Sequence, residues 1–305
     1  MQIDQTDLNL LRAIEWGGIL ACNSAVKDLK LQNEDVQRRL KRLRSEGLLQ
    51  AYRTSVFVPP FLGGDWVWGC TLIQTRKADK VAETIHQKIP FVTEILFNAG
   101  LPSDVGPNLS ILFYATDFGE VQKFLGETRD IDYVEVYQIS KFSFPLAKAF
   151  SSDESKLLRA IAAHPEADLA QLAKVAGQTP AWTEAKLERL VWDPNNPEGV
   201  VLVVPEIDWR KCENFIHVHF LLELSVSTES VVQELGKKGF TPVLEGRLFR
   251  NKYLQLDADV WGFDNLRARK NELDAIKGIH LAGMLMAERN TVVTEWVTRL
   301  LSQNG

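Results

Sequence analysis

An exact internal repeat limits the folds that this chain can adopt. The pentapeptide LLRAI at residues 10–14 recurs unchanged at residues 157–161, and similar segments follow both copies in the same order. Such self-similarity indicates that one structural unit has been duplicated. A chain of 305 residues gives each half enough length for one or two small domains. We therefore interpret the chain as one architecture used twice.

The first part of the chain has the pattern of a winged helix-turn-helix. Asp4 or Thr6 can cap a first helix, in which apolar side chains recur every three residues. A second helix is expected at about residues 24–30, and a third at residues 33–46, where a glycine follows its end. Residues 49–58 alternate weakly in polarity and run into two prolines, which suits a short wing in the form of a hairpin.

Residues 65–148 change to a different periodicity, with segments typical of strands and helices in the order β-α-β-β-α-β. This order defines the ferredoxin-like unit. The second half repeats both patterns and adds a helical tail at residues 292–301. The predicted fold class is α+β, a tandem duplication of a winged helix-turn-helix followed by a ferredoxin-like βαββαβ domain. Four domains are expected, at residues 1–60, 61–150, 151–208 and 209–305, the third being a degenerate winged helix-turn-helix.

Composition favours a cytoplasmic protein with no membrane partner. No apolar stretch approaches the length of a membrane span, and the first residues do not resemble a secretory signal. The three cysteines are widely spaced and include no C-x-x-C pair, which fits a reducing environment and argues against disulfides. The net charge of −5 gives no overall attraction to nucleic acid, so DNA binding requires a local basic patch.

The strongest local signal for a partner is the basic run RRLKRLR at residues 38–44, in the third predicted helix. At helical spacing, Val36, Leu40 and Leu43 form an apolar face, and the cations lie opposite or beside it. A basic third helix of a winged helix-turn-helix can enter the DNA major groove, so we predict contacts to double-stranded DNA. The alternative is an ordinary solvated face. The candidate DNA-binding residues are Asn33, Gln37, Arg38, Arg39, Lys41, Arg42 and Arg44.

The corresponding segment of the second half is acidic. Residues 1–58 contain nine Lys and Arg against seven Asp and Glu, whereas residues 151–208 contain five against ten. The third helix of the second half carries only Lys186 and Arg189 beside two glutamates. Because DNA phosphates repel an acidic surface, we expect this segment to act in packing or dimerisation.

Three motifs carry a resemblance to a known family. They are Asp4-x-x-Asp7-x-x-Leu10-Leu11, Val36-x-x-Arg39-Leu40-x-x-Leu43-x-x-x-Gly47-Leu48-Leu49 and Ala115-Thr116-Asp117-Phe118. The whole chain resembles two fused copies of the Lrp/AsnC family of regulators, which join a winged helix-turn-helix to a βαββαβ ligand-responsive domain. The resemblance implies a transcriptional regulator that responds to a small molecule, such as an amino acid or another metabolite. It also implies homo-oligomers formed through the ferredoxin-like domains.

The same resemblance implies an effector site in the loop between the second and third strands of the ligand-responsive domain. In this chain the loop covers residues 99–108, and the candidate effector-binding residues are Gly100, Ser103, Asp104 and Asn108. A plain surface hairpin loop is an equal alternative. The matching turn of the second half, at residues 245–252, is charged and could bind an anion, although a solvated hairpin is favoured there.

Two further sites are alternatives. A branch of the same architecture, the siroheme decarboxylases, binds a tetrapyrrole, but its signature is absent at residues 97–113, and only Arg250, Tyr253 and Trp261 are suggestive of it. His217-x-His219 places two imidazoles on one strand face, but the sequence shows no third metal ligand, so half-buried strand histidines are favoured. With no Gly-rich phosphate loop or nucleophile elbow, we expect no enzymatic activity, no cofactor and no metal.

Overall fold

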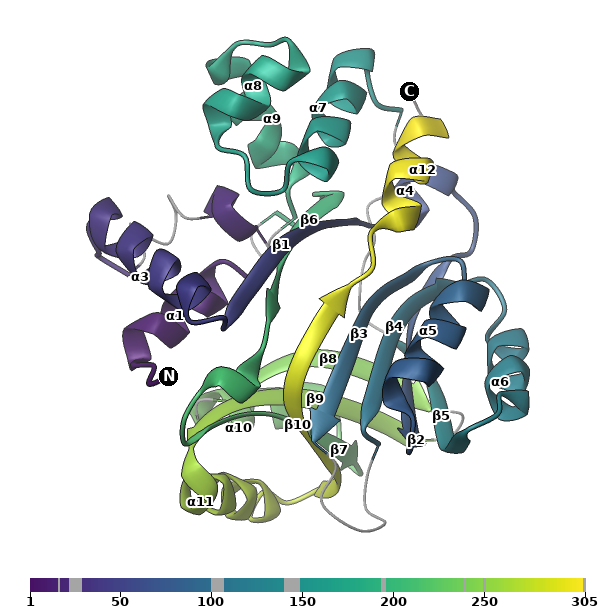
Figure 1. Cartoon of the computed structure of the whole chain (residues 1–305). Coiled ribbons are helices and arrows are strands. Elements are labelled where there is room, and N and C mark those ends of the chain that lie inside the picture. Colours follow the sequence, from purple (N-terminus) through teal and green to yellow (C-terminus); the bar gives the residue numbers. More distant parts are fainter. Residues whose placement is uncertain are drawn as a thin grey trace. The chain divides into compact units, whose positions relative to one another are not determined.

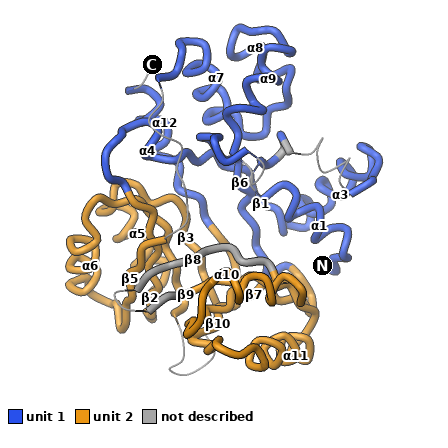
Figure 2. The backbone as a smooth tube through the Cα atoms, turned by 180° about the vertical axis from the view of Figure 1, so that it is seen from behind, with its two compact units in different colours: residues 1–66, 143–211, 291–305 blue, residues 67–142, 212–290 orange. Residues whose placement is uncertain are grey.

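The computed structural model describes residues 1–15, 17–21, 29–99, 107–139, 149–192, 196–238, 240–248 and 251–303. The chain divides into two compact units, which Figure 2 shows in different colours. Unit 1 comprises Met1–Trp66, Ser143–Lys211 and Thr291–Gly305, and unit 2 comprises Val67–Phe142 and Cys212–Asn290. Each unit therefore takes one part from each half of the chain, and the helical tail belongs to unit 1.

The first half contributes to unit 1 the helices α1 (Gln5–Ala13), α3 (Asn33–Ser45) and α4 (Pro59–Leu62), the 3-10 turn η1 (Gly18–Ala21) and strand β1 (Leu49–Val56) (Figure 1). Of the two predicted candidates, Asp4 caps α1, because its carboxylate accepts the N–H of Asp7 while the Asp7 carboxylate accepts the N–H of Asp4. The predicted apolar stripe of α3 is buried. The second predicted helix, at residues 24–30, lies mostly outside the described residues.

The second half contributes helices α7 (Ser152–Ala163), α8 (Leu169–Ala176) and α9 (Pro180–Leu190), strand β6 (Val201–Ile207), the turn η2 (Trp209–Lys211) and the tail helix α12 (Glu295–Gln303). The side chains of Ser151, Asp168 and Thr179 cap the first three helices. The tail helix packs against α7 and buries four apolar side chains, including Trp296. The three helices and the helical tail expected in the second half are therefore present.

The two halves share a two-stranded sheet in unit 1. Strand β1 runs antiparallel to β6, with Leu49 opposite Ile207 and Val56 opposite Val201. The expectation of a wing hairpin at residues 49–58 is therefore wrong, because this segment supplies one strand to a sheet that joins the repeats. Two prolines begin α4 directly after β1, and a segment that starts a helix there cannot return as a second strand.

Unit 2 contains both ferredoxin-like repeats. The first has strands β2 (Val67–Thr75), β3 (Val92–Ala99), β4 (Leu109–Ala115) and β5 (Ile131–Ile139), with helices α5 (Ala78–Lys88) and α6 (Phe118–Glu127). The second has strands β7 (Phe215–Leu224), β8 (Thr241–Leu248), β9 (Asn251–Trp261) and β10 (Ile279–Val292), with helices α10 (Thr228–Lys237) and α11 (Gly262–Asp274). The predicted order β-α-β-β-α-β and the α+β fold class are confirmed.

The strands of both repeats close into one sheet in the order β10-β3-β4-β2-β5-β8-β9-β7. The repeats meet where β10 lies beside β3 and where β5 lies beside β8. A single chain thus pairs its own two ferredoxin-like domains, an arrangement that separate chains would reach only by dimerising.

Strands β7 and β9 have one apolar face, and the opposite face carries a group of polar side chains. Their apolar face, with Phe220 and Leu256 completely buried, forms a core together with side chains of α10 and α11. Because successive side chains of a strand point to opposite faces, the alternate residues His217, His219, Asp257 and Asp259 lie on the other face. No helix among the described residues is long and apolar enough to cross a membrane.

Candidate functional site

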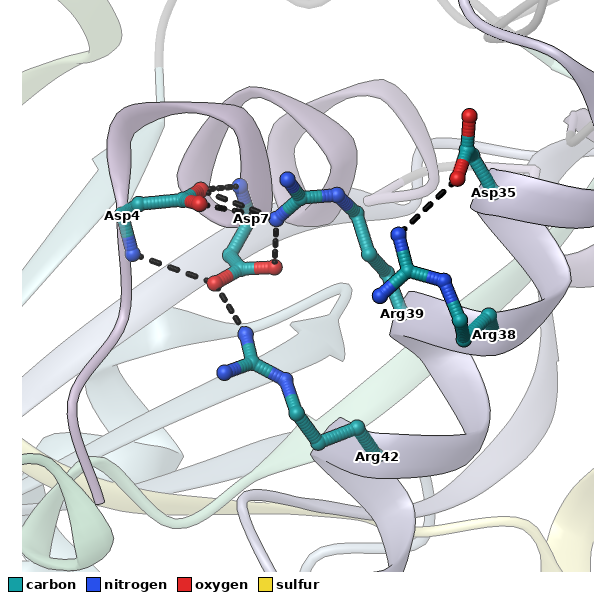
Figure 3. Close-up of polar contacts among 6 residues, drawn as sticks. All are labelled: Asp4, Asp7, Asp35, Arg38, Arg39 and Arg42. Atoms are coloured by element: carbon teal, nitrogen blue, oxygen red, sulfur yellow. Dashed lines mark hydrogen bonds and ion pairs between the residues drawn. The ribbon is translucent and has the colours of Figure 1, made fainter.

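The basic run on α3 is engaged in ion pairs. Arg39 donates through Nη1 to the carboxylates of Asp4, at 2.9 Å, and Asp7, at 2.7 Å, and Arg42 donates to Asp7 (Figure 3). These hydrogen bonds, which the carboxylates of Asp7 and Asp4 accept, raise the pKa of the Arg39 guanidinium. The Asp7 side chain is completely buried, so these ion pairs fasten α1 to α3.

The other arginines of α3 also have carboxylate partners. Arg38 lies 2.8 Å from Asp35 of the same helix, and Arg44 lies 2.6 Å from Glu166 of the second half. The remaining candidate DNA-binding residues, Asn33, Gln37 and Lys41, are exposed. Among the described residues, the four arginines of the basic run thus have carboxylate partners and Lys41 has none.

A matching ion pair links the first and third helices of the second half. Lys186 on α9 lies 2.7 Å from Glu154 on α7. Arg39 and Lys186 are separated by the same number of positions as the two LLRAI copies, and so are Asp7 and Glu154. The ion pair is therefore part of the duplicated scaffold.

Most of the predicted effector loop, including Gly100, Ser103 and Asp104, lies outside the described residues. Asn108 is described, and its side-chain amide bonds the end of β2. Its Oδ1 accepts the N–H of Thr75 at 3.0 Å, and its Nδ2 donates to the carbonyl of Thr75 at 2.7 Å. Both polar atoms of this amide are used within the fold.

Unit 2 places two histidine–aspartate pairs side by side, and we call His217, His219, Asp257 and Asp259 the histidine–aspartate cluster. In the register of β7 and β9, His217 lies opposite Asp259 and His219 lies opposite Asp257. Nδ1 of His217 is 2.7 Å from Oδ1 of Asp259, and Nδ1 of His219 is 2.5 Å from Oδ1 of Asp257. The two imidazole rings are perpendicular, with centroids 4.8 Å apart.

Among the described residues, one ring nitrogen of His219 has no hydrogen-bond partner. Its side chain is 8% exposed, and Gln255 Nε2 approaches its Nδ1 at 3.1 Å. Its Nε2 is buried and has no hydrogen-bond partner among the described residues. Glu94 of β3, which accepts a hydrogen bond from Asn290 at 2.7 Å, acts on His219 through its charge. The cluster is therefore close to an acidic group of the first repeat.

Electrostatics within the cluster couple its imidazoles to its carboxylates. Burial by itself would lower the pKa of His219, but the charge and hydrogen bond of Asp257, with Glu94 and Asp259, outweigh it and raise that pKa. Burial would likewise raise the pKa of Asp257, yet the two histidines and Gln255 lower it. The structure therefore favours an imidazolium–carboxylate pair at His219 and Asp257.

Sequence reasoning identified the histidines but missed both aspartates. The usable signal was the spacing of Asp257 and Asp259, which alternate in a predicted strand just as the histidines do. In the ferredoxin-like order the first and third strands are neighbours, as β7 and β9 are here. The register between them, which decides the pairing, could not be read from the sequence. The side chains of the charged turn at residues 245–252, which the sequence analysis named as able to bind an anion, lie outside the described part of the chain.

No family model and no curated protein matches the chain. Among solved structures, the chain is similar to the siroheme decarboxylase NirDL, with 11% identity, coverage of 98% of both chains and a TM-score of 0.49. It is also similar to AsnC of E. coli, with 18% identity over 49% of this chain and 99% of that chain and a TM-score of 0.29. LrpC of B. subtilis is 19% identical over 46% of this chain and 96% of that chain, with a TM-score of 0.31. Such low identities define no family for this chain.

Proposed function

We propose that this chain is a ligand-binding protein whose site is the histidine–aspartate cluster of unit 2. The observation that carries the proposal is the buried Nε2 atom of His219, which has no partner among the described residues while Asp257 fixes the other ring nitrogen. A buried polar atom without a hydrogen bond costs about 1–3 kcal/mol. A ligand that engages Nε2 recovers this free energy, and the ring is already oriented to receive it.

In this proposal the winged helices hold the chain together and do not read an operator. DNA binding depends on cations that neutralise phosphates. Four arginines of α3 already face carboxylates, and the pair formed by Arg39 has a counterpart in the acidic second half. Breaking such pairs to reach DNA would cost free energy, most of all at the completely buried Asp7. The regulator implied by the family resemblance is the alternative that the test must exclude.

The second candidate is a tetrapyrrole-binding enzyme of the siroheme decarboxylase type, the activity named for NirDL. One observation favours it: an imidazole with Nδ1 on a carboxylate and a free Nε2 is a common way of holding an iron ion. The charges of the site do not fit, because Asp257, Asp259 and Glu94 would repel a ligand that carries several carboxylates. We therefore derive no reaction step through a tetrapyrrole.

Native mass spectrometry of the full-length chain tests the proposal directly. We expect the chain purified from its host to carry an adduct, and the His217→Ala/His219→Ala double variant to lose it. His280→Ala, which changes an exposed histidine of β10, is the matched control and should keep the adduct. A parent chain with no adduct, or an adduct that the double variant retains, contradicts the proposal.

Selection from a random duplex library tests the regulator alternative, and addition of haem tests the second candidate. We expect no enriched DNA sequence and no shift of the haem Soret band. An enriched sequence bound about 10³-fold or more tighter than bulk DNA would establish operator binding, and the Arg38→Ala/Lys41→Ala variant should then weaken it. A Soret shift that His219→Ala abolishes would favour the tetrapyrrole enzyme.

A further inference from the structure

The histidine–aspartate cluster has the donor geometry of a metal site. One donor atom each from His217, His219 and Asp257 lies within 4.8 Å of the other two. Donors about 2.1 Å from a tetrahedral metal ion are about 3.4 Å apart. Metal binding would therefore draw the three groups closer together, and Asp257 would exchange its hydrogen bond with Nδ1 of His219 for a bond to the metal ion.

The donor types indicate which metal ions fit. Two imidazoles and one carboxylate suit divalent first-row transition metals such as Zn²⁺, Co²⁺ or Fe²⁺. Mg²⁺ and Ca²⁺ prefer oxygen ligands throughout, so the histidine pair selects against them. Three protein ligands also leave a coordination position for water or a further ligand.

Two groups beside the three proposed metal ligands are placed to orient them. Asp259, whose side chain is 3% exposed, lies 2.7 Å from Nδ1 of His217, and Gln255 Nε2 lies 3.3 Å from Oδ1 of Asp257. Metal-bound histidines usually bond a carboxylate or carbonyl through their second nitrogen, which fixes the ring. The sequence and register supply such a partner next to the ligands.

The charge of the site also favours a cation. Asp257, Asp259 and the nearby Glu94 carry three carboxylates against two imidazoles, so the carboxylates outnumber the positive charges that the imidazoles can carry. Removing several carboxylates from water is costly unless a cation compensates them. A divalent ion between His217, His219 and Asp257 supplies that compensation, whereas an anionic ligand does not.

We infer that His217, His219 and Asp257 bind one divalent first-row transition-metal ion. The inference rests on the proposed function, because it names the ligand of the same site. It differs from the sequence-based expectation of no metal, which depended on the lack of a visible third ligand.

Cobalt titration of the metal-stripped full-length chain tests the inference. We expect one Co²⁺ per chain, visible absorption from the bound ion, and displacement by Zn²⁺. His217→Ala, His219→Ala and Asp257→Asn should each weaken binding about 10-fold or more. His280→Ala should bind Co²⁺ like the parent chain, and far-ultraviolet circular dichroism should show that each variant is folded.

The parent chain also gives a result that does not depend on any variant. X-ray absorption of its cobalt-loaded form should show imidazole nitrogens and oxygen in the first coordination shell. A spectrum without imidazole, an absence of Co²⁺ binding, or equal binding by the His217→Ala/His219→Ala variant overturns the inference. If an organic adduct still depends on these histidines in native mass spectrometry, the proposed function stands without the metal. If no adduct depends on these histidines, the proposed function and the metal inference are both overturned.

Discussion

A carboxylate removed from water is stabilised by a neighbouring cation, and the two halves of the chain place such an ion pair at equivalent positions. Asp7 and Glu154 occupy the third position of α1 and α7, where each closes a capping box. Each also pairs with a cation of the third helix, Arg39 or Lys186. The residue types differ between the two halves, but the ion pair between the first and third helices is present in both. A run of arginines on the third helix can therefore hold two helices together.

Replacing Glu154 with glutamine should reveal the strength of this link. The ion pair with Lys186 and the hydrogen bonds with Ser151 lower the pKa of Glu154 from an ordinary value of 4.5 to about 2, against the opposing effect of burial, so its charge stabilises the fold above pH 4.5. That stabilisation is lost as the pH falls toward 2. Glutamine keeps the capping geometry but not the charge, so we expect a loss of about 2 kcal/mol at pH 7. Urea unfolding should show this difference shrinking between pH 5 and pH 2.

The control for this variant is Asp153→Asn, which breaks an exposed pair with Lys156. Exposed pairs contribute about 0–1 kcal/mol, so Asp153→Asn should change stability much less than Glu154→Gln does. If Glu154→Gln has the same effect at every pH, the ion pair does not stabilise the fold as described.

At the scale of helices and strands, the sequence predicted what local periodicity and capping determine. The capped helices and the β-α-β-β-α-β order appear where they were expected because each depends on neighbouring residues. Two features were missed for one reason. The pairing of β1 with β6 and the position of Asp257 opposite His219 depend on register between distant segments. Register is fixed by packing across the whole unit, and a single sequence does not reveal it.

The contact of η1 with β6 gives a prediction at this scale. Gly18 has φ +53° in η1, and a Cβ atom there would lie 2.4 Å from Cγ1 of Val203. Gly18→Ala should cost about 1 kcal/mol of stability because L residues disfavour a left-handed backbone conformation. The added methyl group must also displace Val203, which lowers the stability further. We expect a total loss of about 2–4 kcal/mol in denaturant unfolding.

Gly47→Ala separates these two contributions. Gly47 has φ +76° at the end of α3, but a Cβ atom added there would meet its nearest neighbour, Nε2 of Gln50, only at 3.6 Å. Its substitution should cost only the backbone preference, about 1 kcal/mol. Equal losses in the two variants would show that η1 does not pack against β6 in this way.

At the scale of the whole molecule, neither half of the chain can complete a unit by itself. Strand β1 needs β6 from the second half, and β3 and β5 need β10 and β8 to close the sheet. Unpaired strand edges and exposed apolar faces promote association between chains. Residues 1–150 expressed alone should therefore sediment as dimers or larger species.

Adding residues 151–305 to that fragment should restore a complex with the mass of one full chain. The complex should also recover any metal or adduct bound by the histidine–aspartate cluster, whose four members all lie in the second half. A fragment 1–150 that sediments as a stable monomer would argue against the closed sheet.

The closed sheet of unit 2 makes the pairing of the two ferredoxin-like domains independent of protein concentration. Two separate subunits meet only as often as their concentration allows, so a dimeric site is lost when few copies are present. Here the partners are tethered, and the effective concentration of one repeat around the other is fixed by the chain itself. The pairing survives any dilution, and a single molecule carries the complete closed sheet.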